Sequence, residues 1–394
     1  MPQRKRMKIV SVVGARPNFM KVAPVASELR RLSGIEHLLV HSGQHYDDQL
    51  SASFFRDLSL PEPDINLQVG SGTHARQTAQ VMERLEPVLL EFAPNLVVVV
   101  GDVNSTLAAA ITAAKLRIPL AHIEAGLRSF DSSMPEEINR KLTDALCDFL
   151  FVTEPSGVEN LRREGTSPER IFLVGNVMID SLLRHREVAA RSGILGQFGL
   201  RTNGGSVRPY AVLTLHRPSN VDDPRVLGGM LEAVATVARE LPVFFPVHPR
   251  TRQRIESSAC AGCLNPRRNG SALSGLIPSD SLGYLDFLCL MDHARLVITD
   301  SGGIQEETTA LGIPCLTLRE NTERPVTIEQ GTNQLVGADP QRLIALAERV
   351  FQGDYPKGRR PELWDGQAAQ RIVQVLVEHF PVLSDDCRSE TSTD

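Results

Sequence analysis

Short, continuously apolar runs alternate along the chain with longer stretches whose apolar residues recur at helical spacing. In the first half, the apolar runs predict strands at Lys8–Gly14, His37–Gly43, Asn95–Asp102, Leu120–Gly126, Asp148–Glu154 and Ile171–Asn176. The stretches between them predict helices at Phe19–Leu32, Ala75–Phe92, Ser105–Leu116 and Pro135–Leu146. Strands without a polar face are typical of a parallel sheet covered by helices on both sides, so the pattern predicts a doubly wound α/β domain.

The alternation weakens between residues 180 and 207, where Gly, Ser and Asn accumulate, and we expect a linker with flanking loops there. It then resumes, with strands predicted at Ala211–His216, Val243–His248, Leu296–Asp300 and Pro314–Leu318. Helices are predicted at Arg225–Glu240, Tyr284–His293, Gln305–Leu311, Gln341–Phe351 and Gln367–His379. We therefore expect two domains, 1–182 and 183–365, followed by a helix at 366–382 and a disordered tail at 383–394.

Composition narrows the class of protein. A length of 394 residues suits two domains, and 42 Lys and Arg against 47 Asp and Glu give a net charge of −5. Because binding to nucleic acid needs a positive surface, we expect no nucleic-acid partner. No apolar run approaches the roughly 20 residues of a membrane span, and the run after Arg4-Lys5-Arg6 lacks a small-residue cleavage site. We therefore expect no membrane association and no secretion.

Six cysteines are scattered along the chain, which is too few for a disulfide framework. Cys260 and Cys263 are the one close pair, and the second Cys or His pair that a zinc site needs is not nearby. We therefore expect a reducing, cytoplasmic location and no bound metal.

Charged side chains follow two of the strands predicted in the first half. Arg16 and Lys21 follow the first strand at the start of a helix, where two cations suit an anionic group. An ordinary turn with solvated cations explains them equally well. Asp102 ends the most apolar strand, where it serves either as a helix N-cap or as a catalytic group.

Two further carboxylates are expected at the same edge of the sheet. Glu124 ends the next predicted strand, and Glu136 begins the following helix. Carboxylates that converge repel one another, so at least one is expected to have a raised pKa suited to proton transfer. For Glu136, favourable charge at a helix N-terminus is the structural alternative.

The second half carries a predicted phosphate site. Ser301-Gly302-Gly303 separates a strand from a helix, so that backbone N–H groups and the helix dipole would cradle a phosphate. Glu307 lies one turn into that helix, placed to accept both hydroxyls of a ribose, and Arg324 follows the next strand. His216 ends another strand, where a hydrogen-bonded framework role is the alternative. The turn after the first strand has neither the Gly-rich dinucleotide pattern nor the P-loop pattern.

The motifs at the strand ends together resemble those of one family, the UDP-N-acetylglucosamine 2-epimerases. The resemblance covers residues 7 to 380, and the motifs follow in the family's order. They are Gly14-Ala15-Arg16-Pro17, Gly101-Asp102, His122–Arg128, Pro135–Arg140, Asp300–Glu307 and Thr322-Glu323-Arg324-Pro325. The resemblance implies two Rossmann-like domains with parallel sheets around a cleft, the glycosyltransferase-B-like architecture, with the last helix packed on the first domain. It also implies a homodimer.

The resemblance also implies roles for individual residues. The positions that match the family's active site are Arg16, Lys21, Asp102, Glu124, Glu136 and His216, and we expect Asp102, Glu124, Glu136 and His216 to be catalytic. The positions that match its UDP-binding residues are Ser301, Gly302, Gly303, Glu307 and Arg324, with Phe287 near the uracil.

Two departures from the family pattern affect what is expected. Gln44-His45-Tyr46-Asp47 lacks the spacing of two glutamines found in members that a second UDP-GlcNAc activates, so such activation stays open. Leu282 replaces a polar residue common near the uracil, which leaves recognition of the base to backbone groups.

The sequence resembles the non-hydrolysing branch, which interconverts UDP-GlcNAc and UDP-ManNAc. The hydrogen on sugar carbon 2 is not next to a carbonyl, and no nicotinamide motif is present to oxidise the ring, so we expect elimination of UDP to 2-acetamidoglucal and its re-addition, without a cofactor. A hydrolysing epimerase that releases ManNAc, a glycosyltransferase of the same fold and a regulatory protein that binds a sugar nucleotide are the alternatives. The configuration at sugar carbon 4 is left open.

Overall fold

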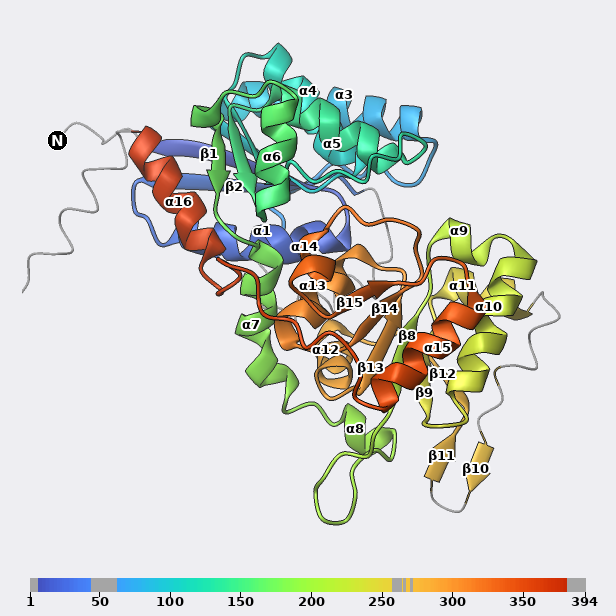
Figure 1. Cartoon of the computed structure of the whole chain (residues 1–394). Coiled ribbons are helices and arrows are strands. Elements are labelled where there is room, and N and C mark those ends of the chain that lie inside the picture. Colours follow the sequence, from blue (N-terminus) through green and yellow to red (C-terminus); the bar gives the residue numbers. More distant parts are fainter. Residues whose placement is uncertain (1–5, 44–61, 257–263, 265–266, 270–271, 381–394) are drawn as a thin grey trace, which may run out of the picture. The chain divides into compact units, whose positions relative to one another are not determined.

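The computed structural model describes residues 6–43, 62–256, 264, 267–269 and 272–380 (Figure 1). The chain divides into two compact units, which we call unit 1 and unit 2. Unit 1 contains the residues up to Arg184 and those from Glu362 onward, and unit 2 contains His185–Pro361. The tail expected at 383–394, Gln44–Asp47 and Cys260–Cys263 lie outside the described residues.

Unit 1 is built on a parallel sheet with the strand order β3-β2-β1-β4-β5-β6-β7. Its strands are β1 (Met7–Val13), β2 (Ile35–His41), β3 (Ile65–Asn66), β4 (Leu96–Val100), β5 (Leu120–Ala125), β6 (Phe149–Val152) and β7 (Ile171–Leu173). Its helices are α1 (Arg16–Arg30), α3 (His74–Phe92), α4 (Asn104–Lys115), α5 (Pro135–Leu146), α6 (Pro155–Arg163) and α16 (Ala368–His379), with a 3₁₀ turn at Pro168–Arg170. Helix α7 (Val177–Ala189) runs from unit 1 into unit 2.

Both faces of this sheet are covered, as the unbroken apolar strands predict. One buried cluster joins strand residues such as Ile9 to Leu29 of α1 and Leu376 of α16. The other joins strand residues such as Val10 to helices α3, α4 and α6. Because side chains alternate along a strand, Ile9 and Val10 belong to opposite faces. Helix α16 contacts α1, so the end of the described chain lies on the sheet of unit 1 (Figure 1).

Unit 2 contains a second parallel sheet, with the order β12-β9-β8-β13-β14-β15. Its strands are β8 (Ala211–Thr214), β9 (Val243–Pro246), β12 (Leu276–Ser279), β13 (Leu296–Thr299), β14 (Cys315–Thr317) and β15 (Asn333–Leu335), and β10 (Arg267–Asn269) pairs with β11 (Ala272–Ser274) in a separate hairpin. Its helices are α8 (Ile194–Gln197), α9 (Pro218–Val221), α10 (Pro224–Val237), α11 (Pro249–Glu256), α12 (Tyr284–Asp292), α13 (Gly302–Leu311), α14 (Val326–Glu329) and α15 (Pro340–Phe351).

In each sheet the strand order reverses beside the first strand. The reversal lies between β1 and β4 in unit 1 and between β8 and β13 in unit 2. This is the order of doubly wound nucleotide-binding folds, in which ligands bind outside the carboxyl ends of the strands at the reversal. Both units therefore have the Rossmann-like topology that the sequence predicts.

The strands and helices predicted from periodicity are confirmed, with ends that differ by a few residues. Helix α7 extends to Ala189 and buries Ile179 and Leu182, so the first part of the stretch in which the linker is expected is helical. Strands β3, β10, β11, β12 and β15 were not predicted. These strands are two to four residues long, too short to form a recognisable apolar run. Strand β12 also contains Pro278, which is tolerated because β12 lies at the edge of its sheet.

None of the helices in the described parts of the chain has the length and apolar character that a membrane span requires.

Candidate functional site

The charged residues singled out in the first half lie at the carboxyl edge of the sheet of unit 1. Lys21 is in the helix that follows β1, and Asp102 follows β4. Glu124 is the second-last residue of β5. Strand β4 pairs with both β1 and β5, so these three segments are neighbours at that edge. The side chain of Arg16 lies outside the described part of the structure.

Glu124 interrupts the strand that carries it. Its φ is +75°, in the left-handed region that residues with a side chain rarely adopt, and the pairing of β5 with β6 shifts register between Ile123 and Ala125. Holding this conformation costs on the order of 1–3 kcal/mol, and such strain concentrates at functional sites. The Glu124 side chain is buried and forms an ion pair with Lys21. Lys21 is therefore not a solvated cation of an ordinary turn.

Gly101 brings the turn before Asp102 against this ion pair. Its φ is +68°, and a Cβ placed on it would lie 3.4 Å from Oε2 of Glu124 and 3.5 Å from Nζ of Lys21. Asn18 anchors the same turn, because its Nδ2 donates to the carbonyl of Val100 at 3.0 Å. The backbone angle favours glycine here, and a Cβ would also lie only 3.0 Å from Nδ2 of Asn18.

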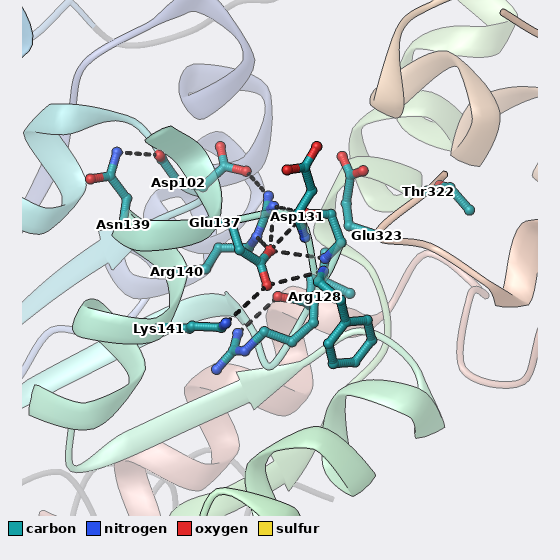
Figure 2. A network of polar contacts seen from close by, with 12 residues as sticks. Asp102, Arg128, Asp131, Glu137, Asn139, Arg140, Lys141, Thr322 and Glu323 are labelled. Atoms are coloured by element: carbon teal, nitrogen blue, oxygen red, sulfur yellow. Dashed lines mark hydrogen bonds and ion pairs between the residues drawn. The ribbon is translucent and has the colours of Figure 1, made fainter. Parts of the chain in front are cut away.

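Asp102 does not cap the helix that follows it. The N-cap position of α4 is Val103, and no side chain caps the helix. Instead, Oδ2 of Asp102 accepts from Nη1 of Arg140 at 2.5 Å, and the Asp102 carbonyl accepts from Nδ2 of Asn139 at 2.8 Å (Figure 2). The Asp102 side chain is 27% exposed although Arg140 is buried. The carboxylate is thus held from one side and open on the other.

Arg140 is itself fixed by Glu137, one turn earlier on α5. Nη2 of Arg140 lies 2.8 Å from Oε2 of Glu137, which also accepts from the backbone N–H of Ser129 at 2.9 Å (Figure 2). Burial opposes ionisation of Glu137, but the hydrogen bonds from Ser129 and Arg140 lower its pKa below the ordinary value. Glu136 lies four residues before Arg140 and therefore on the same face of α5, half-buried, in the first turn of the helix.

In unit 2, the predicted His216 follows β8 and meets Asp300, which follows the adjacent strand β13. Nδ1 of His216 lies 2.7 Å from Oδ1 of Asp300, and the other carboxylate oxygen accepts from the backbone N–H groups of His216 at 2.9 Å and Arg217 at 2.8 Å. Burial opposes ionisation, yet these hydrogen bonds lower the pKa of Asp300. The ring of His216 is 49% exposed, so Asp300 orients it and leaves one nitrogen toward solvent.

Arg324 lies at the N-terminus of α13, where Ser301 is the N-cap residue. A Cβ on Gly302 would come within 2.7 Å of Nη1 of Arg324, so the glycine makes room for the guanidinium. Arg324 is buried and pairs with Glu323 and, through Nε at 2.8 Å, with Glu306. A positive side chain and a helix N-terminus thus meet beside Gly302 and Gly303, as a phosphate site requires.

Glu307 is buried further along α13 and accepts from the hydroxyl of Tyr284 at 3.0 Å. Burial and the nearby charge of Glu306 raise the pKa of Glu307 to about 7, although the hydrogen bond from Tyr284 acts in the opposite direction. Phe287 lies on α12 three residues after Tyr284, hence on the same helix face. The expected ribose acceptor and the expected neighbour of the base therefore belong to two helices in contact.

Several residues of this geometry were not assigned roles from the sequence, among them Arg140, Asp300 and Tyr284. Arg140 stands four residues after Glu136 and Asp300 directly follows an apolar strand, and these are the signals that point to them. Tyr284 carries no such signal, because its partner is 23 residues away. Across the described ranges, no group of three or more His, Cys, Asp or Glu side chains is arranged to hold a metal ion.

Comparison with known proteins identifies one family and several similar sequences and structures. A family model described as UDP-N-acetylglucosamine 2-epimerase matches residues 27–377. The UDP-N-acetylglucosamine 2-epimerase of Methanococcus maripaludis is 38% identical over 371 residues, which cover 94% of this chain and 98% of the relative. The UDP-2,3-diacetamido-2,3-dideoxy-D-glucuronate 2-epimerase of Pseudomonas aeruginosa is 39% identical over 375 residues, covering 94% of this chain and 100% of the relative.

Among solved structures, that of the Methanocaldococcus jannaschii UDP-GlcNAc 2-epimerase in complex with UDP-GlcNAc and UDP is similar to this chain with a TM-score of 0.82 and 38% identity. The match covers 94% of this chain and 100% of that structure. The likeness and the two parallel sheets confirm the expected fold class, two Rossmann-like domains of the glycosyltransferase-B-like type.

Proposed function

The chain belongs to the UDP-N-acetylglucosamine 2-epimerase family, and from that premise we propose that it reversibly converts UDP-GlcNAc to UDP-ManNAc at sugar carbon 2 without releasing the free sugar. The observation that carries the proposal is the placement of Asp102 and Glu124 at the ends of the adjacent strands β4 and β5. Each has its own basic partner, Arg140 and Lys21, so both carboxylates are held ready for proton transfer.

The proposed chemistry is elimination followed by re-addition. A base removes the proton from carbon 2 while the bond from carbon 1 to the diphosphate oxygen breaks, which leaves 2-acetamidoglucal and UDP. UDP then re-adds at carbon 1 as carbon 2 takes a proton on the opposite face. Reaction on two faces requires two acid/base groups, and Asp102, Glu124 and Glu136 are the candidates.

Unit 2 supplies the groups proposed to hold the leaving diphosphate. Arg324 and the backbone N–H groups of Ser301, Gly302 and Gly303 at the start of α13 would bind its oxygens. His216, oriented by Asp300, would stabilise the charge that develops on the departing oxygen.

Further contacts are proposed for the remaining parts of the substrate. Glu307 would accept the ribose hydroxyls, and Phe287 would lie near the uracil. Arg16 and Lys21, which follow β1, would contact the substrate in unit 1. No cofactor enters this proposal.

A second substrate is favoured by one observation. The Pseudomonas aeruginosa relative, named for UDP-2,3-diacetamido-2,3-dideoxy-D-glucuronate, is as similar to this chain as the UDP-GlcNAc enzymes are. Both substrates carry an acetamido group at carbon 2 and UDP at carbon 1, so the same elimination applies to either. They differ at carbons 3 and 6, and direct competition between them decides which one the enzyme uses.

The test is incubation of the purified protein with UDP-GlcNAc alone in D₂O, followed by proton NMR of the products. The proposal predicts UDP-ManNAc with deuterium at carbon 2, because the abstracted proton exchanges with solvent. Free ManNAc with UDP would identify a hydrolysing epimerase, and product formed after addition of an acceptor would identify a glycosyltransferase. Binding of the sugar nucleotide without any turnover would identify a regulatory protein. Parallel reactions with the diacetamido-glucuronate and with UDP-GalNAc define the sugar.

The proposal includes a cytoplasmic homodimer. Support for a second copy comes from α5, where Ile138, Leu142 and Leu146 recur at a spacing of four residues and are 50%, 48% and 37% exposed. Such a stripe on one helix face suits burial against another protein surface.

A further inference from the structure

The strand that carries Glu124 also carries a histidine without a proposed catalytic role. His122 is completely buried, and both of its ring nitrogens make hydrogen bonds. Nδ1 lies 2.6 Å from Oδ1 of Asp144 in α5, and Nε2 lies 2.8 Å from the carbonyl oxygen of Gly101. The ring therefore connects α5 to the turn after β4.

The two partners of His122 both accept hydrogen bonds. The Gly101 carbonyl has no proton to donate. Burial opposes ionisation of Asp144, but the charges of His122 and Arg128 lower its pKa, so its carboxylate also accepts. Arg128, after β5, lies 2.7 Å from Oδ2 of Asp144. Because the Gly101 carbonyl can only accept, Nε2 of the ring is the donor in that bond.

Charged groups surround the ring. Asp144 comes from α5, and Arg128 lies behind it in an ion pair of 2.6 Å with Glu164, which follows α6. On the other side of Gly101 lies the ion pair of Lys21 and Glu124. The carboxylate that meets Nδ1 of the ring is thus itself held in place by an arginine.

Gly101 lies between His122 and Glu124. Its carbonyl accepts from His122, whereas a Cβ on its α-carbon would lie in contact with the carboxylate of Glu124, 3.4 Å from Oε2. We propose that His122 is a positioning residue: it holds the Gly101 carbonyl and thereby sets the position of Asp102 relative to Glu124. The proposal rests on the function proposed above, since it assigns these two carboxylates to proton transfer.

Two substitutions separate the hydrogen bonds of the ring. In asparagine the amide nitrogen is two bonds from Cβ, as Nδ1 is, so His122→Asn retains a donor toward Asp144 and loses the one toward Gly101. In glutamine the nitrogen is three bonds from Cβ, as Nε2 is, so His122→Gln retains the donor toward Gly101 and loses the one toward Asp144. Both variants leave Asp144 paired with Arg128.

The proposal predicts a split between the two variants. His122→Asn is expected to lower kcat about ten- to a hundredfold, because a small displacement of a catalytic group has effects of that size. His122→Gln is expected to stay within about threefold of the wild type, and KM and the Kd for UDP are expected to change less than about twofold in both. His37→Gln is the matched control, because His37 lies on β2 of the same sheet and bonds to Ser11 at 2.9 Å. It is expected to leave kcat unchanged.

A purely structural role makes a different prediction. The losses of kcat would then follow the losses of thermal stability, and Asn and Gln would be equivalent at equal stability. That result would overturn the proposal. NMR of the wild-type protein with ¹⁵N-labelled histidine tests the bond directly, because Nε2 of His122 is expected to carry the proton that it donates to the Gly101 carbonyl. An Nε2 without a proton would also overturn the proposal.

Failure of the proposed function is distinguishable from failure of this inference. A wild-type protein that does not epimerise UDP-GlcNAc contradicts the proposed function before any variant is made. The NMR measurement needs no turnover, so it still supports or overturns the hydrogen bond from His122 to the Gly101 carbonyl in that case.

Discussion

At the scale of single residues, the acids of unit 1 are held by specific cations. Lys21 pairs with Glu124, and Arg140 pairs with Asp102. These ion pairs fix the positions of both carboxylates. The left-handed backbone of Glu124 adds strain that the surrounding structure has to maintain. A carboxylate in such a conformation is more easily explained by catalysis than by stability.

Neutralising either acid is expected to slow epimerisation. Asp102→Asn and Glu124→Gln remove a proton acceptor but keep size and shape, so each is expected to lower kcat about a hundredfold or more. The affinity for UDP should change little, since the groups proposed to bind UDP belong to unit 2. Steady-state kinetics and UDP titration check both statements. Glu159→Gln, at an exposed ion pair on α6, is the control, and near-normal activity of either acid variant would assign that acid to structure.

The raised pKa of Glu307 predicts a pH dependence of stability. Burial raises this pKa from 4.5 to about 7, so between these values the folded state binds more protons than the unfolded state. The free energy of unfolding is therefore expected to fall as the pH rises through this range, by up to about 3 kcal/mol.

Glu307→Gln keeps an acceptor for Tyr284 and removes the titration, so its unfolding free energy should fall less between pH 5 and pH 8. Urea unfolding at both pH values measures the difference. Glu329→Gln, exposed at the end of α14, should behave as the wild type does. Equal slopes for Glu307→Gln and the wild type would contradict the assigned pKa.

At the scale of elements, the proposed chemistry depends on how strands end and helices begin. The irregularity in β5 turns Glu124 toward Lys21, the turn at Gly101 directs Asp102 toward α5, and the start of α13 leaves space for Arg324. Each of these three local features contains a glycine or a residue with a left-handed backbone, at the point where a regular strand would have continued.

Adding a methyl group at the start of α13 tests whether the space beside Gly302 is needed for Arg324. In Gly302→Ala the new Cβ would come within 2.7 Å of Nη1 of Arg324, which must move away from its position beside the helix N-terminus. The Kd for UDP is expected to increase about tenfold, equivalent to one charge-assisted hydrogen bond of about 1.4 kcal/mol. Isothermal titration measures it. Gly229→Ala in α10 meets its nearest neighbour at an ordinary 3.5 Å and should leave the affinity unchanged.

At the scale of the whole molecule, two units of the same topology carry different chemistry. The carboxyl edge in unit 1 presents acids, whereas the corresponding edge in unit 2 presents a histidine, an arginine and a helix N-terminus. This division suits a reaction in which one set of groups moves protons and the other holds an anionic leaving group. The apolar stripe on α5 belongs to neither task, which is why we assign it to self-association.

A charge in that stripe is expected to separate the dimer. Leu142→Asp places a carboxylate in the centre of a face that has to lose water on association, so the variant is expected to sediment as a monomer of 43.2 kDa and the wild type at about twice that mass. Val188→Asp, an exposed apolar position on α7, is the control and should remain dimeric. A monomeric wild type would remove the homodimer from the proposed function.

Periodicity and motifs in the sequence determined most of the elements and the choice of site residues. Apolar runs such as Leu96–Val100 cannot face water on either side, so their place in a covered parallel sheet follows from composition alone. The turn Ser301-Gly302-Gly303 before a helix likewise indicates a phosphate site, because this pattern lies within a few consecutive residues. Short strands with few apolar residues, such as β15, gave no comparable signal.

Only the tertiary structure decided which side chains are partners. Asp102 meets Arg140 across 38 residues, His216 meets Asp300 across 84, and Tyr284 meets Glu307 across 23. The order of strands in each sheet sets these pairs, and strand order depends on packing among elements that are distant in the chain. The left-handed backbone of Glu124 was also decided by the tertiary structure. No pattern of neighbouring residues selects it, because the contacts of Glu124 come from α1 and from the turn after β4.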